Sequence, residues 1–176
     1  MPNAIFNAEN MASTKLSSLL KTVRFVDGGG NPTAINNGMV VTLGALEANQ
    51  REIYVATAVA ANTDPIHVID APEVIYSEEI TRGLNDYTNL AGVPVRARKL
   101  VVGDKFAVSA LAIDALGAAP VVGNFLVTPA AGTQWLEAVA IAGESVACEI
   151  KAIDVLGADL IGGRNIPMYS VEVVVA

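Results

Sequence analysis

The sequence contains very few of the residues on which catalytic and metal sites most often depend. Its 176 residues include one cysteine, Cys148, and one histidine, His67. A single cysteine excludes an internal disulfide, and this pair alone cannot supply a His/Cys metal site. We interpret Cys148, in the run SVACEIKAI, as a small apolar core residue, and His67, in PIHVID, as a packed side chain of a strand.

Charged and aromatic residues are also scarce. Charged residues make up 16% of the chain, against roughly 25% in an average soluble domain. Aromatic residues make up 5%, whereas hydrophobic residues make up 52%. A folded chain with so few charges has little polar material to cover its outside. We therefore expect it to bury part of its surface against neighbouring molecules.

The charge that is present is mainly negative. The formal net charge is −7 at pH 7. Proteins that bind nucleic acid need a basic face, because neutralising phosphates supplies most of the affinity. An acidic excess keeps a protein soluble and repels DNA. The sequence therefore predicts that nucleic acid is not a partner.

The motifs of the common enzyme classes are missing from the sequence. It has no Gly-x-Ser-x-Gly, no Walker lysine loop, no His-Glu-x-x-His and no Cys-x-x-Cys. The Gly-rich run DGGGNP at 27–32 is not followed by Lys-Ser or Lys-Thr, so it is typical of a turn and not of a phosphate-binding loop. We predict a protein that is not an enzyme and has no catalytic residues, metal site or cofactor.

No leader or membrane segment is expected. The first residues, MPNAIFNAENMASTKL, lack a basic stretch followed by an apolar core. The uncharged stretch from Ala115 to Leu136 is as long as a membrane helix, but Pro120, Pro129 and several glycines interrupt it. We interpret it as strands and turns, and we predict no membrane partner.

Short runs of apolar and β-branched residues, separated by Gly, Pro and Asn, fill most of the chain. An Asn-Gly step at 37–38 precedes MVVTL, a pattern typical of strand entry. The same apolar and β-branched composition recurs in runs such as REIYVATAV, SVACEIKAID and YSVEVVVA. About nine or ten such runs predict an all-β fold, a sandwich or barrel of short antiparallel strands.

We predict two parts, an N-terminal arm at 1–23 and a β-rich domain at 24–176. Residues 1–14 are polar and Asn-rich without a period. Apolar residues then follow at helical spacing, but β-branched residues take over at once, so the arm is expected to be extended or short-helical. The residues at helical spacing are Leu16, Leu19, Leu20 and Val23.

One heptapeptide occurs twice, as AIDALGA at 112–118 and AIDVLGA at 152–158. Either the two copies mark a duplicated hairpin, at 106–119 and 146–159, or they are a chance likeness in an Ala- and Val-rich chain. Both copies place an aspartate, Asp114 or Asp154, before a glycine turn. We favour hydrogen bonds to the turn over a catalytic carboxylate pair.

The longest segment without strand character is EVIYSEEITRGLNDYTNLAG, at 73–92. It combines tyrosines with interleaved charges, a composition that suits a contact surface. The residues that we predict to contact a partner there are Tyr76, Glu78, Glu79, Arg82 and Tyr87.

The next stretch, GVPVRARKLVVGDKFAVS at 92–109, predicts a β-hairpin with charges on its outer face. In a strand, Arg96 and Arg98 point to one side, and Val95 and Ala97 to the other. We expect the two arginines to contact an acidic protein surface.

In its order of phrases the chain resembles a known family. NGMVVTL, EIYVAT, PIHVIDAPEVIY and DYTNLAGVPVRARKLVVGDKFAVS follow one another, with a Gly-x-Pro-x-Arg-x-x-x-Leu-x-x-Gly-Asp-x-Phe run in the last. Over residues 24–110 this is similar to the capsid decoration, cement or head-associated proteins of tailed bacteriophages. The part with the two heptapeptide copies carries no such resemblance.

The resemblance implies a virion structural protein without enzymatic activity. Its expected partners are the major capsid protein and copies of itself, as a homotrimer or another homo-oligomer. We expect it to be made in the host bacterial cytoplasm and to stabilise the outer face of the capsid, because packaged DNA inside would repel an acidic chain. The alternatives are another phage component, of the tail or neck, and a ligand- or carbohydrate-binding β-domain. Sugar binding needs exposed aromatic platforms, and the only tryptophan is Trp135.

Overall fold

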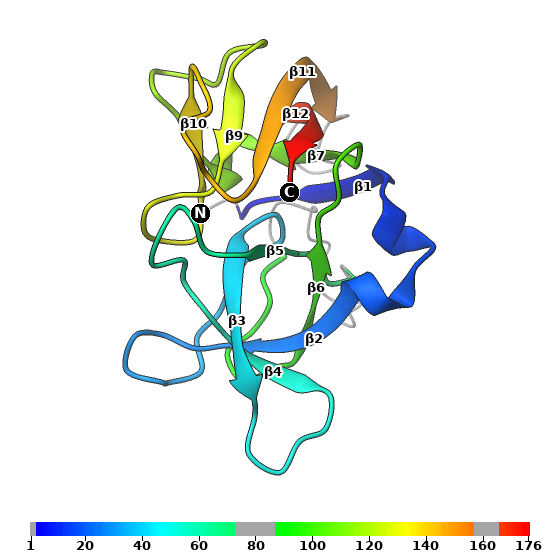
Figure 1. The fold of residues 1–176 in the computed structure, drawn as a ribbon, viewed down its shortest axis with the longest axis vertical. Helices are drawn as coiled ribbons and strands as arrows, with labels where there is room; N and C mark the ends of the chain where they lie inside the picture. The colour runs from blue at the N-terminus through cyan, green and yellow to red at the C-terminus, as the bar shows by residue number, and fades with distance from the viewer. Residues whose placement is uncertain (1–2, 73–86, 157–165) are drawn as a thin grey trace, which may run out of the picture.

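The computed structural model describes residues 3–72, 87–156 and 166–176. In these residues the fold is nearly all β, and two sheets pack against each other (Figure 1). The predicted all-β class is confirmed. No helix in the described residues is long and apolar enough to cross a membrane.

The first sheet is a closed barrel with the strand order β2-β4-β3-β5-β6. Neighbouring strands are antiparallel except β2 and β4, which run parallel. The strands are β2 (Leu20–Phe25), β3 (Val40–Leu46), β4 (Ile53–Thr57), β5 (Ile66–Ile69) and β6 (Val95–Lys99).

The second sheet has seven strands in the order β1-β7-β12-β11-β9-β10-β8, with β8 and β10 parallel. Its strands are β1 (Phe6–Asn10), β7 (Lys105–Ser109), β8 (Ile113–Asp114), β9 (Phe125–Val127), β10 (Trp135–Ala138), β11 (Ala147–Leu156) and β12 (Ile166–Val175). Single 3-10 turns form η1 (Ala12–Thr14), η2 (Ser17–Leu19) and η4 (Ala110–Ala112).

Strands β3 and β5 form a wall between the barrel and the seven-stranded sheet. In β3, Val41 belongs to the apolar cluster inside the barrel, whereas Val40 belongs to the cluster that contains Trp135 of the other sheet. In β5, Ile69 belongs to the cluster inside the barrel, and Val68 belongs to the cluster that contains Trp135. Neighbouring residues of a strand point to opposite faces, so burial on both faces explains the continuous apolar runs.

The Asn-Gly turn before β3 is held against the second sheet. The indole Nε1 of Trp135 donates to the carbonyl of Gly38 at 3.0 Å. Gly38 has a positive φ of 79°, which favours glycine, and a Cβ there would lie 3.3 Å from the carbonyl oxygen of Ile5. The strand entry predicted from the Asn-Gly step is confirmed, because β3 begins at Val40, and the turn is also a junction between the two sheets.

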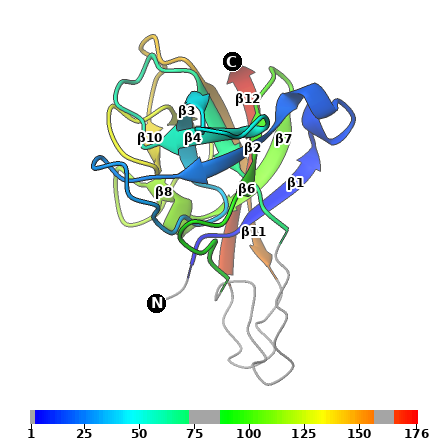
Figure 2. The same ribbon diagram turned by 90° about the horizontal axis from the view of Figure 1, so that it is seen from below.

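Residues near the start of the chain contribute one strand to each sheet, β1 to the seven-stranded sheet and β2 to the barrel. Residues 6–10, which we predicted as part of a loose arm, form β1 and pair with β7 (Figure 2). The predicted boundary at residue 23 falls inside β2 of the barrel. Apolar residues among the asparagines explain this, because Ile5, Phe6 and Met11 are all buried.

The predicted hairpin over 92–109 is wrong. β6 pairs with β2 and β5 in the barrel, whereas β7 pairs with β1 and β12 in the other sheet. The Gly-Asp step therefore lies where the chain crosses between the sheets. Asp104 fixes the crossing, since its two carboxylate oxygens accept from the backbone N–H groups of Ala12 at 2.7 Å and Val101 at 2.9 Å.

The predicted cationic outer face is wrong for Arg98. Arg96 and Arg98 do lie on one side of β6, but the Arg98 side chain is only 7% exposed. It donates to the Asp70 carboxylate and, at 3.0 Å, to the Ser13 hydroxyl. Arg96 donates to the same carboxylate at 2.9 Å. Asp70, placed by β5, therefore neutralises much of the charge that the sequence suggested was free.

The described residues of the two heptapeptide copies adopt different structures, which does not fit a duplicated hairpin. Residues 112–114 run through η4 into the short edge strand β8, whereas residues 152–156 lie inside the long strand β11. Asp154 lies in the middle of a strand pair, where it accepts from the Ser170 hydroxyl at 3.3 Å. The likeness is one of composition.

Replacing Asp70 with alanine is expected to destabilise the fold strongly. The change leaves Arg98 buried without its counter-charge, which costs about 3–5 kcal/mol of unfolding free energy. Glu149→Ala is the matched control, because the Lys151–Glu149 pair is exposed, and it should cost no more than about 1 kcal/mol. Urea denaturation of both variants provides the measurement. Equal, small losses would contradict a structural role for the Asp70–Arg98 pair.

Candidate partner-contact surfaces

The structure describes three of the seven predicted contact residues. Tyr87, Arg96 and Arg98 lie in the described part, and Arg98 is internal. The other four lie outside the described residues. They are Tyr76, Glu78, Glu79 and Arg82.

Tyr87 and Arg96 come together at a groove of about 440 Å³ beside β6. Its lining also includes Leu90 and Val93, whose residues are 66% and 49% exposed. The Tyr87 hydroxyl donates to Asn89 Oδ1 at 3.2 Å. The groove thus combines an apolar rim, a phenol and a half-exposed guanidinium, a mixture that suits a protein contact.

A buried pair of amides supports this groove. Asn37 exchanges two hydrogen bonds with the backbone of Ala71, at 2.9 and 3.0 Å, and its Oδ1 also accepts from Asn89 Nδ2 at 3.0 Å. The backbones of Asn89 and Ile35 form a bridge alongside. The sequence showed Asn37 only as a turn residue, since no local pattern links residues 37, 71 and 89.

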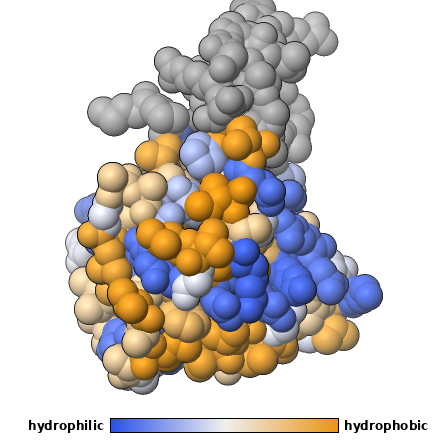
Figure 3. Space-filling view, turned by 90° about the horizontal axis from the view of Figure 1, so that it is seen from above, coloured by the Kyte–Doolittle hydropathy of each residue, from blue (hydrophilic) through white to orange (hydrophobic). Residues whose placement is uncertain are grey.

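A second surface is apolar throughout. Residues 115–123 and 139–143, here called the apolar loop surface, contain no charged residue and adjoin the antiparallel pair β9 and β10. Figure 3 views this end of the molecule and shows apolar residues gathered in a band. Its large exposed residues are Leu116 (59%), Val121 (56%), Val122 (49%), Val139 (71%) and Ile141 (37%).

A buried carboxylate holds this surface in shape. Glu137 of β10 is 1% exposed and accepts from the backbone N–H groups of Leu116 and Val121, both at 2.9 Å. Its third donor is Asn124 Nδ2, at 2.7 Å. Burial acts to raise the pKa of Glu137, but these three hydrogen bonds hold it below its usual value. The loop is thereby fixed while its apolar side chains point to solvent.

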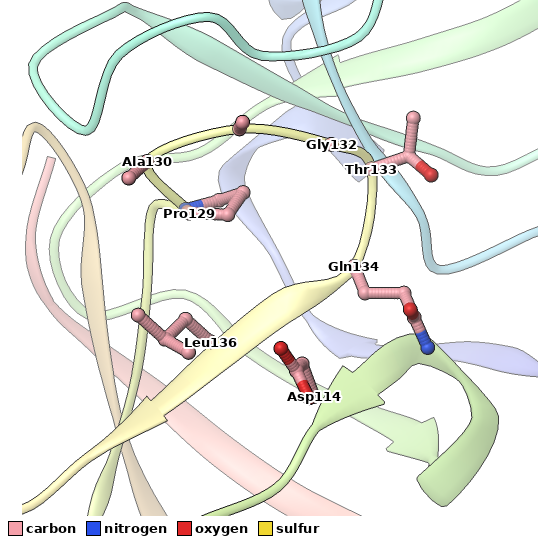
Figure 4. A pocket seen from close by; sticks show the side chains of 8 residues that line it. Asp114, Pro129, Ala130, Gly132, Thr133, Gln134 and Leu136 are labelled. Carbon is pink, nitrogen blue, oxygen red and sulfur yellow. The ribbon is translucent and has the colours of Figure 1, made fainter.

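A small pocket of about 240 Å³ lies at the parallel pair β8 and β10 (Figure 4). Residues 129–134 form one wall, and Asp114 and Leu136 contribute the rest. Gln134 is held by its own bond to the carbonyl of Leu111 at 3.0 Å. Asp114 is exposed, so its carboxylate is available to an amine or N–H donor. The pocket suits a single polar side chain and is small for a drug-sized ligand.

The two residues that attract attention as reactive groups are packed. Cys148 is fully buried in the main core, as predicted, and burial raises the pKa of its thiol. His67 lies in β5, where burial and then the ammonium groups of Lys99 and Lys21 lower its pKa from 6.5 to about 4. Within the described ranges, no group of three or more His, Cys, Asp or Glu side chains is placed to hold a metal ion.

No family model, curated protein or solved structure matches this chain. The resemblance to capsid decoration proteins therefore stays a prediction. The function has to be argued from the chemistry of the surfaces.

Replacing Glu137 with alanine is expected to loosen residues 115–124 selectively. The change removes the acceptor for two backbone N–H groups and one amide, which costs about 1–3 kcal/mol. Hydrogen exchange at Leu116 and Val121 should become faster by about tenfold or more, while amides of the barrel keep their rates. Glu52→Ala, a replacement of an exposed glutamate outside these loops, is the control. Unchanged exchange at both amides would contradict the bracing role.

The pKa of His67 predicts a loss of stability in mild acid. Because its folded pKa is about 4 against 6.5 when unfolded, the unfolded chain binds the extra proton first. The His67 contribution is complete above pH 6.5 and is lost as the pH falls toward 4, by up to about 3 kcal/mol. Urea unfolding between pH 7 and 4.5 should show a shallower fall for His67→Gln than for the wild type. Parallel curves would contradict this assignment.

Proposed function

We propose that this chain is a non-enzymatic structural protein of a tailed-bacteriophage virion that binds the outer face of the assembled capsid. The observation that carries the proposal is the apolar loop surface. It is uncharged, it displays large apolar side chains, and the buried Glu137 fixes it at the cost of desolvating a carboxylate. Fixing a surface in advance lowers the entropy lost on binding.

The charge distribution supports a protein partner on the outside of a shell. A chain with a net charge of −7 is repelled by packaged DNA, whereas an uncharged surface can approach a protein lattice without that penalty. A lattice offers many equivalent sites, so a modest single contact gains avidity. Self-association as a homotrimer or another homo-oligomer is part of the same proposal.

The groove beside β6 is proposed as the second contact. Arg96 and Tyr87 are its polar groups, and Leu90 and Val93 form its exposed apolar rim. Arg98 has no place in this contact, because it is buried against Asp70. A half-exposed arginine at the edge of an apolar contact is well suited to an acidic residue of the capsid protein.

The carbohydrate-binding alternative is disfavoured by the packing of the tryptophan. Trp135 is fully buried, and its indole N–H is engaged with Gly38. It therefore cannot serve as a stacking platform for a sugar. A location in the tail or neck remains the alternative that a binding experiment has to separate from the capsid.

Purified protein is expected to co-sediment saturably with empty and with DNA-filled shells that lack it. The variant Val121→Glu with Val139→Glu should bind about tenfold more weakly, because each carboxylate would have to be desolvated in an apolar contact. Val102→Glu is the matched control, since Val102 is a 60% exposed valine outside the apolar loop surface.

The capsid assignment fails if neither shell carries the protein down, or if only free DNA does. Saturable binding to purified tails, with no binding to shells, would establish the tail alternative instead. Equal weakening by Val102→Glu would show that the apolar loop surface is not the contact.

A further inference from the structure

Three basic side chains gather at one end of the barrel. Lys21 is near the start of β2, His67 near the start of β5, and Lys99 at the end of β6. The antiparallel register places His67 opposite Lys99 and Lys21 opposite Ala97. Alternation along β6 puts Lys99 on the same side as Ala97, which belongs to the barrel core. The three residues, here called the basic cluster, therefore close one end of that core.

Acidic side chains do not neutralise this cluster. In the part of the chain that the structure describes, Lys21 and Lys99 take part in no ion pair. In the parallel pair β2 and β4, Thr22 lies opposite Ile53, and Lys21 and Glu52 are the residues that precede them. Lys21 and Glu52 nevertheless form no ion pair. The ammonium of Lys21 instead lies 5.7 Å from the centre of the Tyr54 ring. Two free ammonium groups in one place are unusual in a chain whose net charge is −7.

One nitrogen of the imidazole beside the two lysines also lacks a hydrogen-bond partner. Nδ1 of His67 is buried and has no hydrogen-bond partner among the described residues. Both lysines act on the ring, since they lower its pKa after burial does. A buried polar atom without a partner costs free energy, and a site that receives a ligand is one reason for such an atom to persist.

We propose that Lys21, Lys99 and His67 form a binding site for a carboxylate group of an acidic segment in a partner protein. The two ammonium groups supply charged donors for the carboxylate oxygens, and the partly buried ring provides a floor of low dielectric that strengthens the attraction. The site is separate from the apolar loop surface and from the groove that contains Arg96.

An acidic peptide fits this site better than a nucleic acid does. A nucleic acid presents a phosphate charge every few ångströms, so binding needs an extended basic surface. The basic cluster offers two full charges, and the exposed Glu52 lies on a neighbouring barrel loop. A polyanion that followed the surface would be repelled beyond the cluster, whereas one or two carboxylates would not.

The single histidine makes the test direct, because the imidazole Hε1 signal in an NMR spectrum can come only from His67. Titration of the full chain with an acetylated hexaglutamate peptide is expected to shift this signal saturably. Lys21→Gln with Lys99→Gln should weaken the interaction about five- to tenfold, as expected for two lost charge pairs. Lys21→Arg with Lys99→Arg retains the charges and should restore most of it.

Lys15→Gln with Arg51→Gln is the matched control, since it removes two exposed cations elsewhere and changes the net charge equally. It should leave the affinity within about twofold of the wild type. The proposal is overturned if the peptide leaves the His67 signal unmoved, if the control weakens binding as much as the cluster variant, or if a single-stranded oligonucleotide binds more tightly than the peptide. Because no shell is used, this result is independent of the capsid assignment.

Discussion

Strands β3 and β5 have to be buried on both faces, and the arrangement of the molecule follows from this requirement. A barrel of five short strands covers only their inner residues, Val41 and Ile69. Their outer residues, Val40 and Val68, need a second apolar layer, which the seven-stranded sheet supplies with Trp135. Burying each valine is worth about 1.5–3 kcal/mol, so neither sheet keeps its stability without the other. The two sheets therefore form one cooperative unit.

Buried polar groups then fix the loops that leave this core. Asp104 binds the backbone of Ala12, and Glu137 binds that of Leu116 and Val121. Asn37 does the same for Ala71. In each case one side chain satisfies backbone groups from a distant segment, so a loop without regular structure acquires a defined shape. The two candidate contact surfaces lie next to such braces, so their loops have defined backbone hydrogen-bond partners.

The sequence predicted the strands well and their pairing poorly. Alternation and turn residues placed β3 to β7 and β9 to β12, because these signals are local. The partner of a strand depends on residues far away, so β6 and β7 looked like a hairpin although they belong to different sheets. β1 was missed because its asparagines made the segment look polar, although Phe6 within it is apolar.

For the candidate sites too, the sequence predicted local features and missed contacts between distant segments. The strand period placed Arg96 and Arg98 on one side of the strand. No sequence feature near them indicated that Asp70 would pair with both. The sequence therefore indicated free arginines and gave no sign that Lys21 and Lys99, which come from two separate strands, lie together without an ion pair in the described structure. Glu137 looked like an ordinary charge within a strand, and its role depends on the loop that folds over it.

The strand order of the second sheet also sets the order in which the molecule can fold. β12 (Ile166–Val175) pairs with both β7 and β11, so the centre of that sheet cannot form until the ribosome has made residue 175. The strands of the barrel, in contrast, all lie within residues 20–99 and are synthesised much earlier. During that interval Val40 and Val68 lack their covering layer. A nascent barrel with exposed apolar strands is prone to aggregate. Pairing of β12 completes the sheet that covers these strands, so the last strand of the chain also affects the yield of folding.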